Sequence, residues 1–208
     1  MEIDKTVNII GRDILCFAAD DWWIHNPHSN HHLMKEFAKR NRILYVNSLG
    51  IRTPRLGQEA VWNRMTGKLR SLSRYVSRVQ KNLWVFTPVG FPLVRGHEPL
   101  VAAVNDLLLS IQLGLVLRYL GFQSILFWVT SPLIRRTLLR MRKVSETIVY
   151  HAVDNFSLFP GINGEYLRRE DEVINAAADI AFFVNERFFE ERLTICPVSV
   201  LLGHGVDL

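Results

Sequence analysis

The chain has 208 residues, of which 49% are hydrophobic and 22% charged. This composition is typical of a globular domain with a sizeable core and excludes a disordered chain. The net charge of +5 favours an anionic partner, but its sign does not choose among nucleic acid, phospholipid and a sugar nucleotide. The two cysteines, Cys16 and Cys196, lie in apolar runs and are expected to be buried thiols in a reducing compartment.

Short apolar runs alternate with helical stretches along the chain. Residues 12–19 predict a first buried strand, and residues 29–40 predict a helix with Ser29 or Asn30 as its N-cap. Further strands are predicted at 42–47, 82–87, 124–129, 146–153, 180–184 and 198–202. The runs are continuously apolar, as in parallel strands that helices cover on both faces. The pattern predicts one α/β domain over residues 1–208, with a doubly wound, mainly parallel, Rossmann-like sheet.

Residues 51–81 differ from the rest of the chain. Eight basic residues stand there against the single acid Glu59, and apolar residues such as Trp62 and Tyr75 recur among them at spacings of three and four. This spacing predicts an amphipathic helix. Such a helix either lies on an anionic membrane surface or packs on the sheet with its cationic face in water, and the sequence leaves both open.

Residues 99–120 form a second unusual segment, apolar enough and long enough to imitate a membrane span. The segment contains Asp106, Gln112 and Arg118 and lies between two predicted strands. These features favour a helix that packs on the sheet over a helix that crosses a bilayer.

The densest polar cluster follows the first predicted strand, at the edge where doubly wound sheets bind ligands. The candidates there are Asp21 and His25 for catalysis, and Trp22, His28, Ser29 and Asn30 for substrate binding. A helix N-terminus offers free N–H groups to a phosphate, and a histidine can supply a proton or a charge. A metal site on His28 and His32 has less support, because no thiolate cluster accompanies them. Polar residues that only cap the helix are the alternative.

A second cluster, His151, Asp154 and Asn155, follows the fifth predicted strand. Asp154 is a candidate general base for an acceptor hydroxyl, with His151 orienting it. Turn formation is the alternative role for the Asp-Asn pair. No dinucleotide-binding glycine motif, P-loop, nucleophile elbow or Asp-x-Asp metal motif occurs in the sequence, which disfavours the enzyme classes that depend on them.

Five segments together resemble the N-terminal domain of bacterial GT-B glycosyltransferases of the group 1, family 4-like type. They are Asp21–Trp23 after the first strand, the strand at 42–47, the strand and loop at 147–154, the helix, strand and turn at 172–185, and the terminal 201–207. They occur in the family's order and span most of the chain. Two departures are Asn185, where many members have serine, and Gly203-His204, where they have proline or leucine followed by asparagine.

The resemblance implies transfer of a sugar from a nucleotide donor, which is a substrate and not a cofactor, to an acceptor held mainly by this half. It implies Asp154 as the first choice for the base, followed by Asp21 and His25. It adds Asn185, His204 and Gly205 to the substrate-binding candidates, beside His151 and Asn155. The nucleotide-sugar-binding half is expected to be missing from these residues, so the chain alone is expected to be inactive.

The basic stretch also fits a lipid-linked acceptor, such as a polyprenyl-diphosphate sugar of exopolysaccharide or cell-wall assembly. The expected location is the cytoplasm, peripheral on the inner face of the cell membrane. The alternative is a non-catalytic, membrane-associated subunit that recruits a separate donor-binding protein. Nucleic acid is not an expected partner, because no binding motif accompanies the basic charge.

Overall fold

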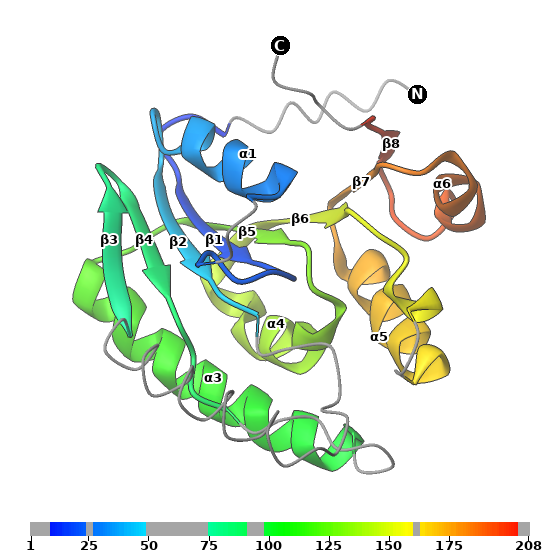
Figure 1. The fold of residues 1–208 in the computed structure, drawn as a ribbon, viewed down its shortest axis with the longest axis horizontal. Helices are drawn as coiled ribbons and strands as arrows, with labels where there is room; N and C mark the ends of the chain where they lie inside the picture. The colour runs from blue at the N-terminus through cyan, green and yellow to red at the C-terminus, as the bar shows by residue number, and fades with distance from the viewer. Residues whose placement is uncertain (1–8, 24–26, 49–74, 91–97, 160–162, 204–208) are drawn as a thin grey trace.

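A computed structural model of the chain describes residues 9–23, 27–48, 75–90, 98–159 and 163–203, and Figure 1 shows its fold. In these ranges eight strands form one sheet in the order β3-β4-β2-β1-β5-β6-β7-β8. The strands are β1 (Asp13–Phe17), β2 (Arg42–Val46), β3 (Val76–Gln80), β4 (Leu83–Phe86), β5 (Ile125–Val129), β6 (Ser145–Ala152), β7 (Ile180–Phe183) and β8 (Ser199–Leu201). All neighbours pair in parallel except β3, which is antiparallel to β4.

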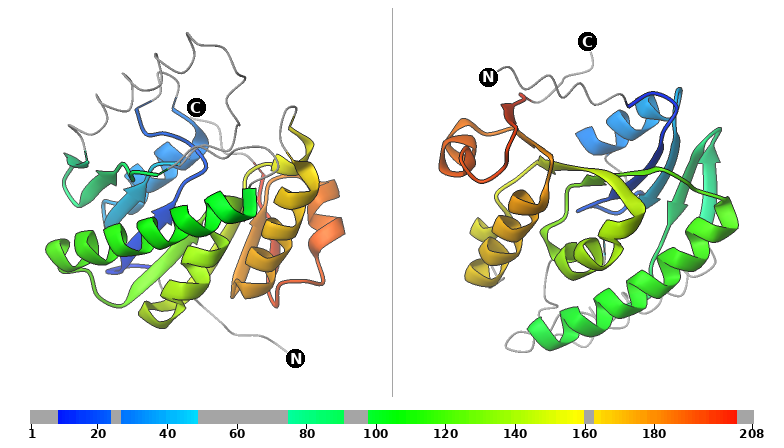
Figure 2. Two further views of the ribbon diagram at one scale, coloured as in Figure 1. Left: turned by 90° about the horizontal axis from the view of Figure 1, so that it is seen from below. Right: turned by 180° about the vertical axis from the view of Figure 1, so that it is seen from behind.

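Helices cover both faces of this sheet. They are α1 (Ser29–Phe37), α3 (Glu98–Leu120), α4 (Arg135–Met141), α5 (Gly164–Ala177) and α6 (Glu186–Arg192), with short 3₁₀ turns η1 (Pro132–Ile134), η2 (Arg142–Val144) and η3 (Phe156–Leu158). Figure 2 shows α3, α4 and α5 side by side on one face, whereas α1 lies on the other. The predicted doubly wound, mainly parallel α/β fold is confirmed.

The continuously apolar strands bury both of their faces, as predicted. In β1, Leu15 and Phe17 belong to the core beneath α3, α4 and α5, whereas Ile14 and Cys16 belong to the core beneath α1. Every residue of β1 and of β5 is buried. Two apolar layers therefore hold the central strands in place, and their carboxyl ends form a fixed frame for the loops that follow.

The predicted amphipathic helix at 51–81 is wrong over its last residues, because Val76–Gln80 form the edge strand β3. Asn82 adopts a left-handed backbone, with φ of 65°, in the tight turn that joins β3 to β4. Across this hairpin the Arg78 guanidinium lies 5.5 Å from the centre of the Trp84 ring. Cross-strand packing therefore outweighs the helical spacing here. Residues 49–74 lie outside the described residues.

Helix α3 packs on the sheet, as expected for residues 99–120. Leu109, Leu113 and Val116 are buried in the core, and Asp106 is buried with its carboxylate accepting a 2.7 Å hydrogen bond from the Thr137 hydroxyl of α4. By length and composition, Pro99–Leu120 is the one span among the described residues that would suffice to cross a membrane, and 39% of its most apolar 18-residue window is buried. The exposed residues of the helix face away from the sheet.

Candidate functional site

The candidate site lies at the edge of the sheet where the parallel strands end. Hydrogen bonds tie the loop after β1 to the ends of its neighbours on both sides. The Ala19 N–H donates to Thr130 Oγ1 after β5 (3.0 Å), and the Trp22 N–H donates to Asn47 Oδ1 after β2 (2.9 Å). Asn47 Nδ2 in turn donates to Thr87 Oγ1 after β4 (2.9 Å). These hydrogen bonds therefore hold the loop in one conformation at the ends of the strands.

Asn47, Thr87 and Thr130 were not among the predicted site residues. Each is the first polar residue after an apolar run, a signal that the sequence does contain. Asn47 and Thr130 bond to the β1 loop and Thr87 bonds to Asn47, so the three side chains act as supports for the site.

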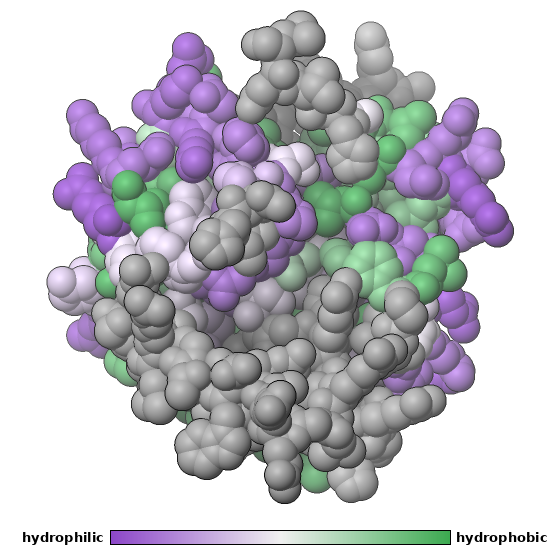
Figure 3. Space-filling model, viewed as in Figure 1, coloured by the Kyte–Doolittle hydropathy of each residue, from purple (hydrophilic) through white to green (hydrophobic). Residues whose placement is uncertain are grey.

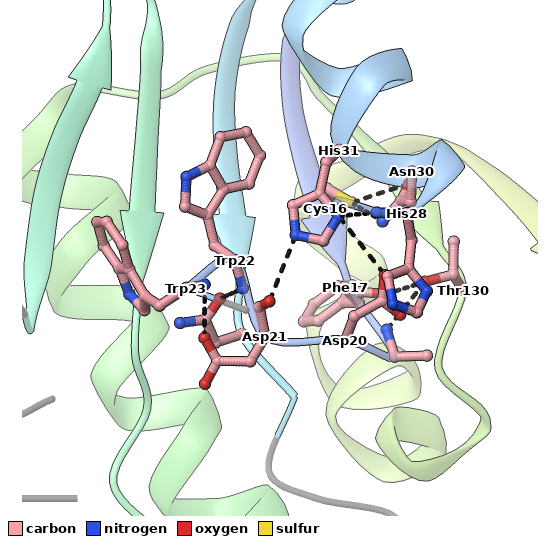
Figure 4. Close-up of polar contacts among 12 residues, drawn as sticks. Cys16, Phe17, Asp20, Asp21, Trp22, Trp23, His28, Asn30, His31 and Thr130 are labelled. Carbon is pink, nitrogen blue, oxygen red and sulfur yellow. Dashed lines mark hydrogen bonds and ion pairs between the residues drawn. The ribbon is translucent and has the colours of Figure 1, made fainter. Parts of the chain in front are cut away.

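Helix α1 begins at Ser29, but its N-cap is His28 and not the predicted Ser29 or Asn30. His31, one turn in, closes the helix end: its Nδ1 accepts a 3.1 Å hydrogen bond from the His28 N–H. Its Nε2 lies 3.3 Å from the carbonyl oxygen of Asp21 (Figure 4). An acceptor at Nδ1 and a donor at Nε2 define a neutral imidazole with its proton on Nε2. Burial lowers the pKa of His31 and favours the same form.

Asp20 lies beside this histidine, with its Oδ2 atom 3.8 Å from His31 Nδ1. Burial raises the pKa of the Asp20 carboxyl, while the nearby His28 and His31 oppose the increase. The sequence prediction named Asp21 and missed Asp20. The two differ in the structure, because Asp21 Oδ1 accepts a 2.9 Å hydrogen bond from the Trp23 N–H and so closes a local turn.

The other predicted residues of this cluster have separate places. Trp22 stands edge-on to the Tyr45 ring, with centroids 4.9 Å apart, and stacks obliquely near His31. Asn30 is buried, with its Nδ2 atom 3.6 Å from Cys16 Sγ, and fastens α1 to β1. His28 and Ser29 are exposed at the start of α1, where a ligand can reach them. His25, His204 and Gly205 lie outside the described residues.

The second cluster follows β6, two strands away from β1 across β5. Asp154 is exposed, and its Oδ1 accepts a 3.0 Å hydrogen bond from the Asn155 N–H. Asn155 Oδ1 accepts from the Ser157 hydroxyl, so its side chain supports the turn that continues into η3. His151 is buried in β6, edge-on to the Trp128 ring at 5.5 Å.

Asn185 follows β7 at the same edge and caps α6, its Oδ1 accepting a 3.0 Å hydrogen bond from the Phe188 N–H. On the surface around this edge, Figure 3 shows hydrophilic side chains over α1 and α6 and a hydrophobic area between them. The exposed Val200, Leu201 and Leu202 lie at this end of the sheet. In the ranges that the structure describes, no three His, Cys, Asp or Glu side chains are grouped as a metal ion requires.

Several solved structures have a fold similar to that of this chain. Sucrose-phosphate synthase from Thermosynechococcus elongatus superposes with a TM-score of 0.56 at 8% identity, over 94% of this chain and 90% of that one. An α,α-trehalose-phosphate synthase (UDP-forming) from Burkholderia vietnamiensis gives 0.53 at 16% identity, over 92% of this chain and 47% of that one. The chain has the fold of a GT-B half.

UDP-N-acetylglucosamine 2-epimerase from Rickettsia bellii is also similar, with a TM-score of 0.50 at 11% identity, over 94% of this chain and 45% of that one. The chain therefore spans about half the length of the epimerase and of the trehalose-phosphate synthase. No family model and no curated protein sequence matches it. At these identities the likeness concerns the fold, and the chemistry must be argued from the site.

The buried His31 predicts a stability that falls in mild acid. Its pKa is lower in the folded chain than the ordinary 6.5, so the unfolded chain takes up a proton first as the pH falls below that value. This contribution to the free energy of unfolding is complete above about pH 6.5 and decreases below it. The difference between the free energies of unfolding at about pH 7.5 and about pH 5.5, measured with urea, should be smaller in His31→Asn than in the unaltered chain. The asparagine keeps an acceptor for the His28 N–H. An equal difference in both proteins would contradict the assignment.

Proposed function

We propose that this chain is the acceptor-binding half of a glycosyltransferase that moves a sugar from a nucleotide donor to an acceptor. The observation that carries the proposal is the polar edge of the sheet, where the loop after β1 holds Asp20 and Asp21 and leads into α1, and where the loop after β6, two strands away, holds Asp154. The proposal is supported by the fold, which this chain shares with two synthases named for sugar phosphates. The match to the second of these spans about half its length, and the proposal assigns donor binding to a second half or subunit.

In the proposed reaction an acceptor hydroxyl lies against the β6 loop. Asp154, exposed at this edge, takes the hydroxyl proton as the oxygen attacks the anomeric carbon of the sugar. The new bond joins the acceptor oxygen to that carbon, and the bond from the carbon to the nucleotide phosphate breaks. The exposed start of α1, at Ser29, offers the positive end of the helix dipole to a phosphate of the substrate, with the exposed His28 side chain beside it.

A lipid-linked acceptor is the finer part of the proposal. The net charge of +5 suits a substrate that carries a diphosphate and lies in an anionic membrane. The second candidate function is a non-catalytic subunit that holds a separate donor-binding protein at the membrane. The outward-facing apolar side of α3 supports both functions equally, because each of them places this chain on a bilayer.

A transfer assay with a radiolabelled sugar nucleotide tests the proposal. Three samples are compared: this chain, a chain extended beyond Leu208, and this chain mixed with a separately expressed donor-binding protein of the same fold. Transfer by the extended chain alone supports the acceptor-binding half. Transfer only in the mixture supports the recruiting subunit. Donor binding by the 208-residue chain itself would contradict the proposed division between halves.

A further inference from the structure

The outward side of α3 has a composition that water-facing helices lack. From Pro99 to Leu120 the exposed residues are Pro99, Leu100, Val104, Leu107, Ile111, Gly114, Leu115, Arg118 and Tyr119. Arg118 is the single charged side chain among them. The six large apolar or aromatic members are between 42% and 84% exposed. A helix on the surface of a globular protein normally turns charged and polar residues outward, so this face is built to meet an apolar environment.

The polar residues of α3 are directed elsewhere. Asp106 is buried and bonded to Thr137, and Gln112 Nε2 donates a 2.9 Å hydrogen bond to the carbonyl oxygen of Val89 in the loop after β4. Leu109, Leu113 and Val116 fill the core beneath the helix. With polar groups satisfied inward and a core on the same side, the helix cannot turn its whole circumference to lipid. It is suited to lie flat on a bilayer, not to cross it.

The exposed apolar side chains follow one stripe. Leu100, Val104, Leu107, Ile111, Leu115 and Tyr119 are spaced by three or four residues, so they line one side of the helix. At a rise of about 1.5 Å per residue this stripe is roughly 30 Å long. The view from below in Figure 2 shows α3 as a long helix at the surface of the helical layer, with α4 beside it.

The charges around the stripe identify its partner. From residue 98 to residue 144 the sequence has six basic and two acidic residues, and one of the two acids is the buried Asp106. On α4 and η2, beside α3, the exposed residues are the apolar Leu139 and Val144 and the basic Arg140, Arg142 and Lys143, of which Arg142 pairs with Asp179. A symmetric dimer through this face would bring two copies of the same cationic rim together. An anionic bilayer meets both the apolar stripe and the rim.

We infer that the exposed face of α3, together with the basic residues Arg118, Arg140 and Lys143, is a docking surface for an anionic phospholipid bilayer. The apolar stripe enters the acyl boundary, and the basic side chains contact lipid phosphates. Tyr119, near the end of the helix, has the amphipathic ring that membrane interfaces favour. The inference rests on this face alone and holds whether or not the chain takes part in sugar transfer.

Vesicle flotation with the full chain tests the inference. Vesicles of neutral phosphatidylcholine are compared with vesicles that also contain phosphatidylglycerol, at low and at high salt. Binding should be strong only to the anionic vesicles at low salt, and high salt should weaken it because ions screen the basic rim. Equal and poor binding to both kinds of vesicle would overturn the inference.

Two matched substitutions separate the stripe from general charge effects. Ile111→Glu places a carboxylate in the centre of the stripe, whereas Ile10→Glu makes the same change before β1, at nearly the same exposure (55% and 54%). We expect Ile111→Glu to weaken binding to anionic vesicles at least about tenfold, and Ile10→Glu to leave it close to that of the unaltered chain. Equal effects of the two substitutions would show that the stripe does not dock.

A fluorescent label on the stripe provides a second measurement of docking, and this measurement does not require a charged variant to fold. Cys16 and Cys196 are buried, so a thiol-reactive, polarity-sensitive dye attaches at an introduced Ile111→Cys. Its emission should shift to the blue on anionic vesicles, whereas a dye at Glu36→Cys on α1, across the sheet, should not shift. Size-exclusion chromatography tests whether a second copy of the chain occupies this face instead of a bilayer. A dimer that Ile111→Glu converts to a monomer, without any dye shift on vesicles, would assign the face to self-association and overturn the inference.

Discussion

Replacing Asp154 by alanine, in an extended chain that shows transfer activity, should lower kcat about 100-fold or more. The side chain is exposed at the carboxyl end of β6 and bonds to its own loop, where Oδ1 accepts from the Asn155 N–H. One carboxylate oxygen thus fixes the turn, and the other faces solvent, where an acceptor hydroxyl can approach. Loss of the carboxylate removes the proposed base but little packing, so the melting temperature should change little. Initial rates with the labelled donor measure the effect.

Two controls separate the base from the turn. Asp154→Asn keeps an oxygen for the Asn155 N–H but cannot take a proton, so it should be as slow as Asp154→Ala. Glu165→Gln removes an equally negative, exposed carboxylate on α5 and should retain full activity. Full activity in Asp154→Ala would reject Asp154. In that outcome the same series moves to Asp21 and to the half-buried Asp20.

The sequence allowed most of the strands to be predicted, because burial on both faces leaves a continuous apolar run. Seven of the eight strands begin and end within about two residues of their predicted positions. The place of each strand in the order was not predicted. Strand β5 pairs with β1 and not with β4, its predecessor in the sequence, and the long α3 between them packs beneath the sheet. A doubly wound sheet requires one such crossover, but local patterns do not show which connection makes it.

The missed strand, β3, shows a different limit. Its five residues are all partly buried or exposed, and a basic side chain such as Arg78 on an edge strand resembles the polar face of a helix. The contacts that favour a strand over a helix come from the neighbouring strand β4: Tyr75 lies edge-on to Phe86, and Arg78 lies over Trp84. Spacing within the segment alone therefore favoured the wrong structure.

At the candidate site, the sequence located the loops but not the roles of single side chains. The end of an apolar run marks the ligand-facing edge, which is why the region around Asp21 and the region around Asp154 were both named. Which histidine is buried depends on where α1 begins, and a start one residue after His28 turns Asn30 and His31 inward. His31 and Asp20 were missed for this reason. Their coupling exists only after α1 has packed on β1.

The largest effect on stability is expected at a buried network between β6, α5 and α6. The Tyr150 hydroxyl donates a hydrogen bond to the Asp171 carboxylate, and Arg192 Nε lies 3.4 Å from the other carboxylate oxygen. Tyr150 is fully buried, and the side chains of Asp171 and Arg192 are only 11% and 12% exposed. Asp171→Ala leaves a buried hydroxyl without its acceptor and removes one of the two carboxylates that face the guanidinium, since Glu172 Oε1 stays 3.1 Å from Arg192 Nη1. We expect the free energy of unfolding to fall by about 2–3 kcal/mol, and the melting temperature by roughly 5–10 °C.

A matched change on the same helix shows what burial contributes. Glu165 pairs with Arg169 one turn away on α5, but both side chains are more than 60% exposed, so Glu165→Ala should change stability by no more than about 0.5 kcal/mol. Asp171→Asn separates the two interactions, because it keeps an acceptor for the Tyr150 hydroxyl and loses the charge that faces Arg192. If denaturant unfolding gives the same small change for Asp171→Ala as for Glu165→Ala, the network does not hold α5 and α6 on the sheet. If Asp171→Asn keeps most of the stability, the hydrogen bond to Tyr150 contributes more than the ion pair.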